Sequence, residues 1–209
     1  MILWLASYPK SGNTWVRTFI STYYFGNNNK FEFSLLKNIK QFPHEKFFSR
    51  KLNNINDAIE KWVEAQENII KANNITFLKT HSAFAKINNF PFTTNKQTIG
   101  AIYIIRDPRN VVTSISNHFQ MDFENTINFM INKRKFLINK MKPDNYGNFT
   151  FLNSWSEHYN SWIRNNQFKT LLIKYEDLQK NSIKTFERIV LFINEISNKD
   201  EKIDKNKIE

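Results

Sequence analysis

The sequence predicts an α/β fold with a mostly parallel central sheet and helices on both of its faces. Short apolar runs alternate along the chain with amphipathic segments, the order typical of such sheets. The 209 residues fit one domain, and 41% of them are hydrophobic, enough to build a core. Neither an internal repeat nor a glycine-rich or proline-rich linker divides the chain. Because ligands bind beyond the carboxyl ends of parallel strands, the residues that follow apolar runs are the candidate site.

Four apolar runs predict the strands of this sheet. Each is short and bounded by polar or turn-forming residues, as expected for strands buried between helices. In chain order they cover residues 2–8, 75–79, 100–105 and 170–174. The first run has no basic segment before it and stops at Tyr8-Pro9, so we expect a buried strand and not a signal peptide. No apolar run approaches the roughly 20 residues of a membrane span.

Five segments with apolar residues at helical spacing predict the helices. In chain order they cover residues 13–25, 57–72, 108–119, 151–166 and 182–195. Asn56 or Asp57 is the expected cap of the second helix. Asp107 is the expected cap of the third, with Pro108 at its first position. The polar and basic stretch of residues 27–51 predicts a mobile segment or short helices.

Composition limits the compartment and the partners. The chain has no cysteine, which excludes disulfides and cysteine-bound metals and is compatible with the cytoplasm, where we expect the protein. The net charge of +11 permits an anionic partner, but the general abundance of lysine and asparagine makes it an unspecific signal. We expect no nucleic-acid partner. The domain is expected to span residues 1–197, followed by a charged, disordered tail over 198–209.

The segment YPKSGNTW, residues 8–15, combines a strand end, a tight turn and a helix start. Unpaired N–H groups and a partial positive charge make helix N-termini suitable for phosphate-like anions. Lys10 supplies a positive charge, and Ser11 and Thr14 supply hydroxyls. Gly12 lets the backbone approach the anion, and Asn13 and Thr14 can open the helix. The lysine precedes the glycine, so this is not a Walker A motif. A chance turn with a solvated lysine is the alternative.

A second motif, FLKTH, follows the next expected strand. Lys79 and His81 are two residues apart, so their side chains point the same way in an extended chain. A neutral imidazole beside a cationic lysine suits proton abstraction near neutral pH. The alternative is a partly exposed histidine at a strand end.

Two further motifs follow the last two expected strands. In IIRDPRNVVTS, Arg106 is placed to grip a phosphate and Ser114 to add a hydroxyl two turns into the helix. The alternative is an ordinary capped helix in which Arg106 pairs with Asp107 or another carboxylate. In LLIKYEDL, Tyr175 follows the last expected strand, where a buried tyrosine in a strand-end turn is one interpretation.

These four motifs, in this order, resemble those of the cytosolic-type sulfotransferases, which use 3′-phosphoadenosine 5′-phosphosulfate (PAPS) as cosubstrate. The resemblance extends from residue 2 to about residue 195 and implies the P-loop NTPase-like sulfotransferase fold. YPKSGNTW resembles the family's 5′-phosphosulfate loop. By this resemblance Lys10 would neutralise the leaving nucleotide, Lys79 would assist at the sulfuryl group, and His81 would deprotonate the acceptor.

The resemblance also assigns the rest of the nucleotide. Arg106 and Ser114, eight residues apart as in the family, would contact the 3′-phosphate. Trp15 would stack on the adenine, although a helix tryptophan is more often part of a core, and Tyr175 would lie near the same base. Asn110 stands where the family usually has an aspartate. The segment containing Trp155, His158 and Trp162 resembles the family's helix before the last strand and is expected to be structural.

The sequence differs from the family in one motif and leaves the acceptor open. The family's C-terminal Arg-Lys-Gly loop, which closes over the nucleotide, has no counterpart in it. The implied reaction moves a sulfuryl group to a hydroxyl or amine of a small molecule, glycan or lipid. No metal is expected, because lysines and the helix dipole supply positive charge. The alternatives are a P-loop-type kinase, or a non-catalytic nucleotide- or anion-binding module on the same scaffold.

Overall fold

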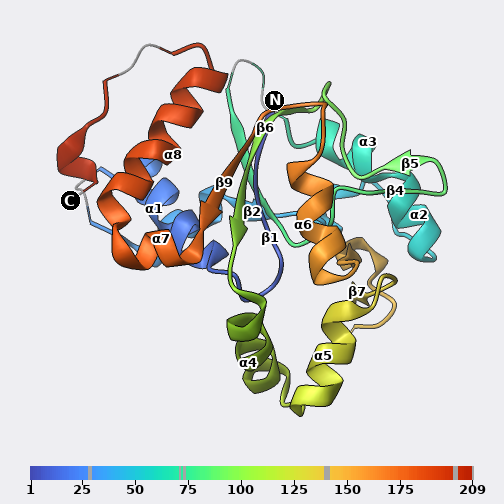
Figure 1. The fold of residues 1–209 in the computed structure, drawn as a ribbon. Helices are drawn as coiled ribbons and strands as arrows, with labels where there is room; N and C mark the ends of the chain where they lie inside the picture. The colour runs from blue at the N-terminus through green and yellow to red at the C-terminus, as the bar shows by residue number, and fades with distance from the viewer. Residues whose placement is uncertain (28–29, 71, 73, 139–141, 200–201, 209) are drawn as a thin grey trace.

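A five-stranded parallel sheet forms the centre of the protein in the computed structural model, which describes residues 1–27, 30–70, 72, 74–138, 142–199 and 202–208. The strand order is β2-β3-β1-β6-β9 (Figure 1). The strands are β1 (Ile2–Ser7), β2 (Lys40–Gln41), β3 (Thr76–Thr80), β6 (Thr98–Ile105) and β9 (Thr170–Lys174). The predicted α/β class is confirmed. Each strand expected from the sequence is present within two residues of its expected bounds.

The central position of β1 follows from its composition. Every residue of β1 is buried, because helices cover both faces of the sheet. Leu5 pairs with Lys79 of β3 on one side and with Ile102 of β6 on the other. On the opposite face, the indole N–H of Trp4 donates to the Thr98 hydroxyl at 2.9 Å, so the largest side chain of the strand is buried without an unpaired polar group.

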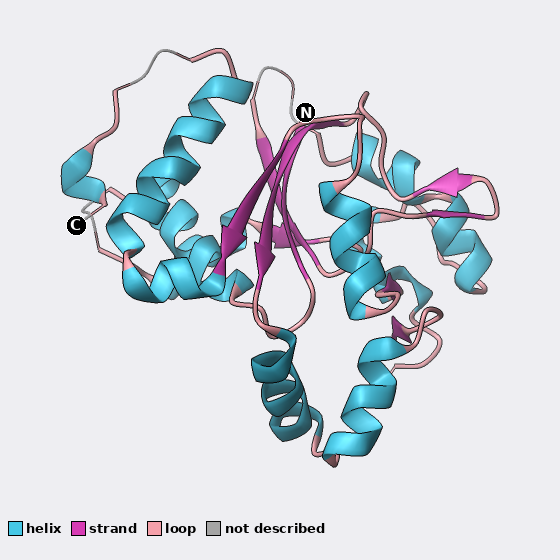
Figure 2. Ribbon diagram, in the orientation of Figure 1, coloured by secondary structure: helices cyan, strands magenta, loops and turns pink. Residues whose placement is uncertain are grey.

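Three groups of helices surround the sheet (Figure 1). One face is covered by α1 (Asn13–Phe25), α7 (Tyr175–Lys180) and α8 (Ser182–Ile196). The other face is covered by α2 (Ile55–Glu60), α3 (Trp62–Glu67) and α6 (Trp155–Ile163). The last pair, α4 (Pro108–Phe119) and α5 (Phe123–Ile131), lies beyond the end toward which the arrows of the central strands point (Figure 2). The motifs singled out in the sequence follow the strands at this same carboxyl end of the sheet.

Two expected helices have different bounds. The single helix expected over 57–72 is wrong, because the backbone leaves helical geometry at Lys61 (φ −99°, ψ 4°) and divides it into α2 and α3. The cap is Asn54, whose side chain accepts from the Asp57 N–H, and not Asn56 or Asp57. The helix expected over 151–166 is shorter, because Phe151 lies in the short strand β8 (Thr150–Phe151). The expected position 71 lies outside the described residues.

Several short elements were not expected. Helix α5 is capped by Asp122, whose carboxylate accepts from the Asn125 N–H at 2.7 Å, and α7 follows β9 without a loop. Over residues 27–51, where the sequence predicts a mobile segment or short helices, two short 3₁₀ helices are present, η1 (Phe33–Asn38) and η2 (Glu45–Phe47). The strand β2 in this stretch was not expected, and residues 28 and 29 lie outside the description. Two antiparallel pairs and two more 3₁₀ turns complete the elements: β4 (Lys86–Ile87), β5 (Phe90–Pro91), β7 (Phe136–Leu137), β8, η3 (Tyr146–Asn148) and η4 (Lys205–Lys207).

The described part of the expected tail packs against α1. Ile208 is 8% exposed and Ile203 is partly buried, and both belong to the core cluster beneath α1 and α8. The main-chain N–H of Asp204 donates to the Tyr23 hydroxyl at 3.1 Å. The two isoleucines bury apolar surface in this cluster, which favours the packed position of the segment. The domain boundary at residue 197 stays a prediction.

Candidate active site

The turn after β1 places main-chain donors at the carboxyl edge of the sheet. Lys10 (φ 67°) and Gly12 (φ 97°) both adopt left-handed backbone conformations, which fold the chain back on itself before α1. Gly12 occupies the cap position of α1, so no side chain caps the N–H groups of the first turn. Those N–H groups are the donors that suit an anion.

Buried side chains hold this turn against the end of β1. The Asn13 amide donates to the carbonyl of Leu5 at 3.0 Å and to the hydroxyl of Ser7 at 3.2 Å, and so ties the start of α1 to the end of β1. The Ser11 hydroxyl is buried and has no hydrogen-bond partner among the described residues. A buried hydroxyl without a partner is uncommon and fits a turn built to hold a further group. Thr14 and Trp15, by contrast, are exposed at the surface.

Arg106, at the end of β6, contacts this turn directly. Its Nη1 donates to the main-chain carbonyl of Lys10 at 3.1 Å, and its guanidinium carbon lies 4.4 Å from the centre of the Tyr175 ring. Its Nε is buried without a partner among the described residues. The expected alternative, pairing with Asp107, is wrong, because that carboxylate pairs with Arg109 at 2.5 Å. Arg106 thus keeps donors for a ligand.

Tyr175, the first residue of α7, packs on the glycine of the turn. A Cβ added at Gly12 would lie 2.4 Å from Cδ2 of the Tyr175 ring, closer than any such contact allows. The ring also meets Trp15 edge-on, with centroids 6.0 Å apart. Tyr175 is half-buried between Arg106 and Trp15. Three strand ends, those of β1, β6 and β9, therefore meet around one turn.

His81, just past the end of β3, is held against the end of β1. Its Nδ1 lies 2.7 Å from the main-chain carbonyl of Ser7 and 3.3 Å from the Ser7 hydroxyl. A carbonyl only accepts, so Nδ1 carries the proton and Nε2 is left with its lone pair. Burial, and then the charge of Lys79, lower the pKa of His81 to about 3. The imidazole is therefore neutral near neutral pH and offers Nε2 as a proton acceptor.

Lys79 lies in β3, on the face covered by α1. Its ammonium donates to the Gln41 side chain of β2 at 3.3 Å. Burial, and then the charge of Arg17, lower the pKa of Lys79 to about 8. Arg17 of α1 donates in turn to the Leu36 carbonyl at 2.7 Å. Neither cation has a carboxylate partner among the described residues, so a ligand that neutralises them must be anionic.

Ser114 is not brought into contact with the turn. It lies two turns into α4 and is half-buried, and within the described ranges no hydrogen bond joins it to Arg106 or to residues 8–15. The sequence also missed three side chains that surround the candidate base and lysine: Arg17, Gln41 and Tyr103. No sequence pattern marks these residues, because each lies near the site only through contacts between elements that are distant in the chain.

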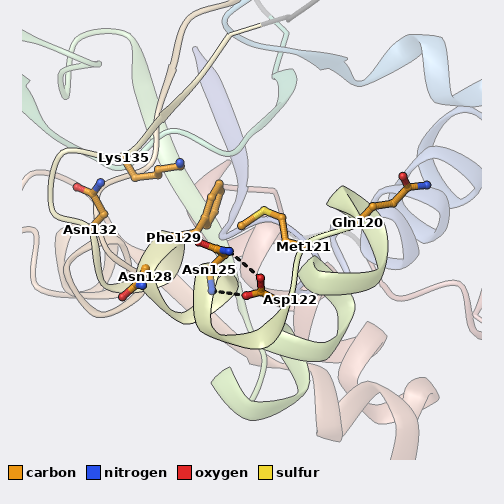
Figure 3. Close-up of a pocket in the computed structure, with 8 residues that line it drawn as sticks. All are labelled: Gln120, Met121, Asp122, Asn125, Asn128, Phe129, Asn132 and Lys135. Carbon is orange, nitrogen blue, oxygen red and sulfur yellow. Dashed lines mark hydrogen bonds between the residues drawn. The ribbon is translucent and has the colours of Figure 1, made fainter.

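A hollow of about 450 Å³ lies against α5 and the segments that precede and follow it (Figure 3). Carboxamides dominate its lining, which consists of Gln120, Met121, Asp122, Asn125, Asn128, Phe129, Asn132 and Lys135. Phe129 and Met121 also belong to the apolar cluster that holds Tyr8, the residue that opens the turn. The hollow and the turn thus border the same apolar cluster. None of the helices described is long and apolar enough to cross a membrane.

Comparison with known proteins gives one family. The family model described as "Sulfotransferase domain" matches residues 2–207. A luciferin sulfotransferase of Photinus pyralis is 23% identical over 216 residues, which cover 98% of this chain and 52% of that protein. This chain thus spans about half the length of that relative.

Solved structures give the same fold. A mouse sulfotransferase, SULT7A1, complexed with PAP, superposes with a TM-score of 0.55 at 18% identity, covering 98% of this chain and 61% of the other. Retinol dehydratase, in one structure with androsterone and the inactive cofactor PAP and in another with retinol and PAP, gives TM-scores of 0.58 and 0.57 at 16% identity, covering 99% and 62%. With its parallel sheet, its anion-suited turn and a family match over residues 2–207, the chain belongs to the sulfotransferase domain family.

Proposed function

We propose that the protein transfers a sulfuryl group from PAPS to a hydroxyl or amine acceptor. The observation that carries this proposal is the meeting of Arg106 and Tyr175 on the turn between Lys10 and Gly12. Motifs that are far apart in the sequence thus meet at this turn; Arg106 and Lys10 are separated by 96 residues. A neutral histidine with an available lone pair, His81, is held at the end of the same strand, β1. A nucleotide with a phosphate at each end of its ribose is a ligand that needs donors from several strand ends at once.

The residues present fit the nucleotide. The uncapped N–H groups at the start of α1 would hold the 5′-phosphate, and the Lys10 ammonium would neutralise charge at the oxygen that links phosphate to sulfur. The unpartnered Nε of Arg106 would donate to the 3′-phosphate, with Ser114 as the further hydroxyl implied by the family pattern. Trp15 and Tyr175 would offer aromatic surface to the adenine.

The reaction breaks the bond between sulfur and the bridging oxygen and forms a bond between sulfur and the acceptor oxygen or nitrogen. The bridging oxygen leaves with both bonding electrons as part of 3′-phosphoadenosine 5′-phosphate (PAP). Nε2 of His81 takes the acceptor's proton, because Nδ1–H is held by Ser7. Lys79, which has no carboxylate partner among the described residues, would stabilise the sulfuryl oxygens during transfer.

The acceptor would approach from the side of α4 and α5. The carboxamide-lined hollow in Figure 3 shares Phe129 and Met121 with the apolar cluster that also holds Tyr8, which makes it the candidate acceptor site. Asn128→Leu should raise the acceptor KM and leave the affinity for PAP unchanged. A rise in the PAP Kd instead would assign the hollow to the nucleotide.

The lack of cysteine accords with a cytoplasmic enzyme.

Transfer of labelled sulfate from PAPS to a panel of phenols, alcohols, amines and sugars tests the proposal. We expect stoichiometric release of PAP with labelled product, both lost in Lys10→Met. Magnesium-dependent ATP hydrolysis without sulfate transfer would support the kinase alternative. Salt-sensitive binding of RNA without PAP binding would support a non-catalytic module.

A further inference from the structure

A closed ring of hydrogen bonds surrounds the candidate base and includes a second histidine, His158. Nε2 of His158, in α6, lies 3.1 Å from the main-chain carbonyl of His81. Nδ1 of the same ring lies 2.8 Å from the Tyr103 hydroxyl of β6. His158 is 0% exposed and Tyr103 is 1% exposed, so neither exchanges these partners for water.

The direction of each hydrogen bond in the ring is fixed by chemistry. The His81 carbonyl only accepts, so Nε2 of His158 carries the proton and Nδ1 must accept from the Tyr103 hydroxyl. The Tyr103 oxygen is also hydrogen-bonded to the backbone of Tyr8, at the end of β1. From His81 the ring closes through Nδ1–H to the carbonyl of Ser7, the residue before Tyr8.

Position 158 needs a group that donates at one end and accepts at the other, and a neutral imidazole meets both needs. Burial lowers the pKa of His158 to about 4, so it is neutral near neutral pH, and only its hydrogen bond to the His81 backbone acts in the other direction. A protonated His158 would have two donors and no acceptor for the Tyr103 hydrogen.

We propose that His158 is a positioning residue for the base: it holds the main chain of His81 so that the His81 ring keeps Nδ1–H on Ser7 and presents Nε2 to the acceptor. This role rests on the proposed function for its catalytic meaning. Its structural content, the orientation and tautomer of His81, stands on the ring alone.

Long-range ¹H–¹⁵N spectra of the histidine side chains test the proposal on the 209-residue chain without ligand. We expect His81 as the Nδ1–H tautomer and His158 as the Nε2–H tautomer at pH 7.5. In His158→Leu the fixed tautomer of His81 should give way to exchange between both forms. In His158→Gln, which can accept from Tyr103 and donate to His81, the Nδ1–H tautomer should persist. Tyr103→Phe gives a second route if the leucine variant fails to fold, with a smaller loss in the same direction.

Turnover supplies the second readout. In His158→Leu, kcat should fall between roughly tenfold and a hundredfold while the affinity for PAP stays the same, and glutamine should restore most of it. Ser161→Ala is the matched control. Its hydroxyl accepts from the Phe84 N–H at 3.0 Å and donates to the main-chain carbonyl of His158 at 2.7 Å, so the variant loses two hydrogen bonds of α6 and keeps those of the His158 ring. An unchanged His81 tautomer in both His158→Leu and Tyr103→Phe, or an equal fall of kcat in Ser161→Ala, would overturn the proposal. If the wild type binds no PAP, the proposed function fails, and the spectra still decide the positioning role.

Discussion

Two side chains at the end of β3 have their charge states set by burial. Lys79 and His81 both have pKa values below their ordinary range, Lys79 at about 8 and His81 at about 3. The lysine stays largely protonated at neutral pH and the histidine stays neutral, which is the division of roles that sulfuryl transfer requires. The bound anionic donor would raise both values, because negative charge favours the protonated forms.

Removal of the proposed base, His81, should lower turnover strongly without affecting nucleotide binding. We expect His81→Ala to reduce kcat by roughly 10²–10⁴-fold, the usual contribution of a general base. His81→Asn is the sharper variant, since its amide can still donate to the Ser7 carbonyl but has no basic nitrogen. Initial rates of sulfate transfer and calorimetric titration with PAP measure the two effects separately. Turnover that survives in His81→Asn would exclude His81 as the base.

Lys79 is expected to lower the free energy of unfolding while it contributes to activity. Its ammonium is half-buried near Arg17, so the folded chain binds its proton less tightly than the unfolded chain does. Lys79→Met should therefore raise the free energy of unfolding at pH 7 by about 1 kcal/mol, after allowance for solvent screening, and lower kcat. Urea unfolding measures the first effect, and Lys40→Met, at an exposed position of β2, is the control. Destabilisation by Lys79→Met would contradict this account.

At the scale of elements, the turn between β1 and α1 depends on contact with α7. Gly12→Ala places a Cβ against the Tyr175 ring and forces alanine into a left-handed conformation. We expect it to lower the free energy of unfolding by about 1–3 kcal/mol and to weaken PAP binding. Adding Tyr175→Ala should recover the part due to the ring contact and leave the backbone part. Full additivity of the two substitutions would show that the ring does not press on the turn.

Some elements could be predicted from the sequence and others could not. Four strands and α1 were predictable because apolar period and turn residues agree locally, and Asp107-Pro108 marked the start of α4. The break at Lys61 was not, because the apolar pattern continues across it and only the backbone geometry reveals two helices. At the site, Arg106 and Tyr175 were predictable from strand ends, whereas Tyr103 depends on a hydrogen bond across 55 residues of sequence separation.

The whole molecule should lose stability as the pH falls below 6.5. His81 and His158 have folded pKa values of about 3 and about 4, against about 6.5 in an unfolded chain. Between pH 6.5 and 4 the unfolded state therefore binds protons that the folded state does not. The free energy of unfolding thus decreases as the pH decreases. Each histidine contributes a slope of at most about 1.4 kcal/mol per pH unit.

Urea unfolding at pH 7.5, 6 and 5 measures this slope. The double variant His81→Asn, His158→Gln removes both titrating groups and should flatten it. A slope that is unchanged in the double variant would assign the acid sensitivity to carboxylates elsewhere in the chain. Both folded pKa values lie below 5, so the single variant His158→Gln should account for about half of the change.

The central claim at this scale is that strand ends far apart in the chain form one nucleotide site. Calorimetric titration with PAP of the wild type, Arg106→Gln and Arg109→Gln tests it most directly, because Arg109 is exposed and paired with Asp107 whereas Arg106 contacts the turn. We predict binding of one PAP per chain, weakened roughly tenfold to a hundredfold in Arg106→Gln and unchanged in Arg109→Gln. Absence of binding by the wild type, or equal affinity in all three proteins, would contradict the account.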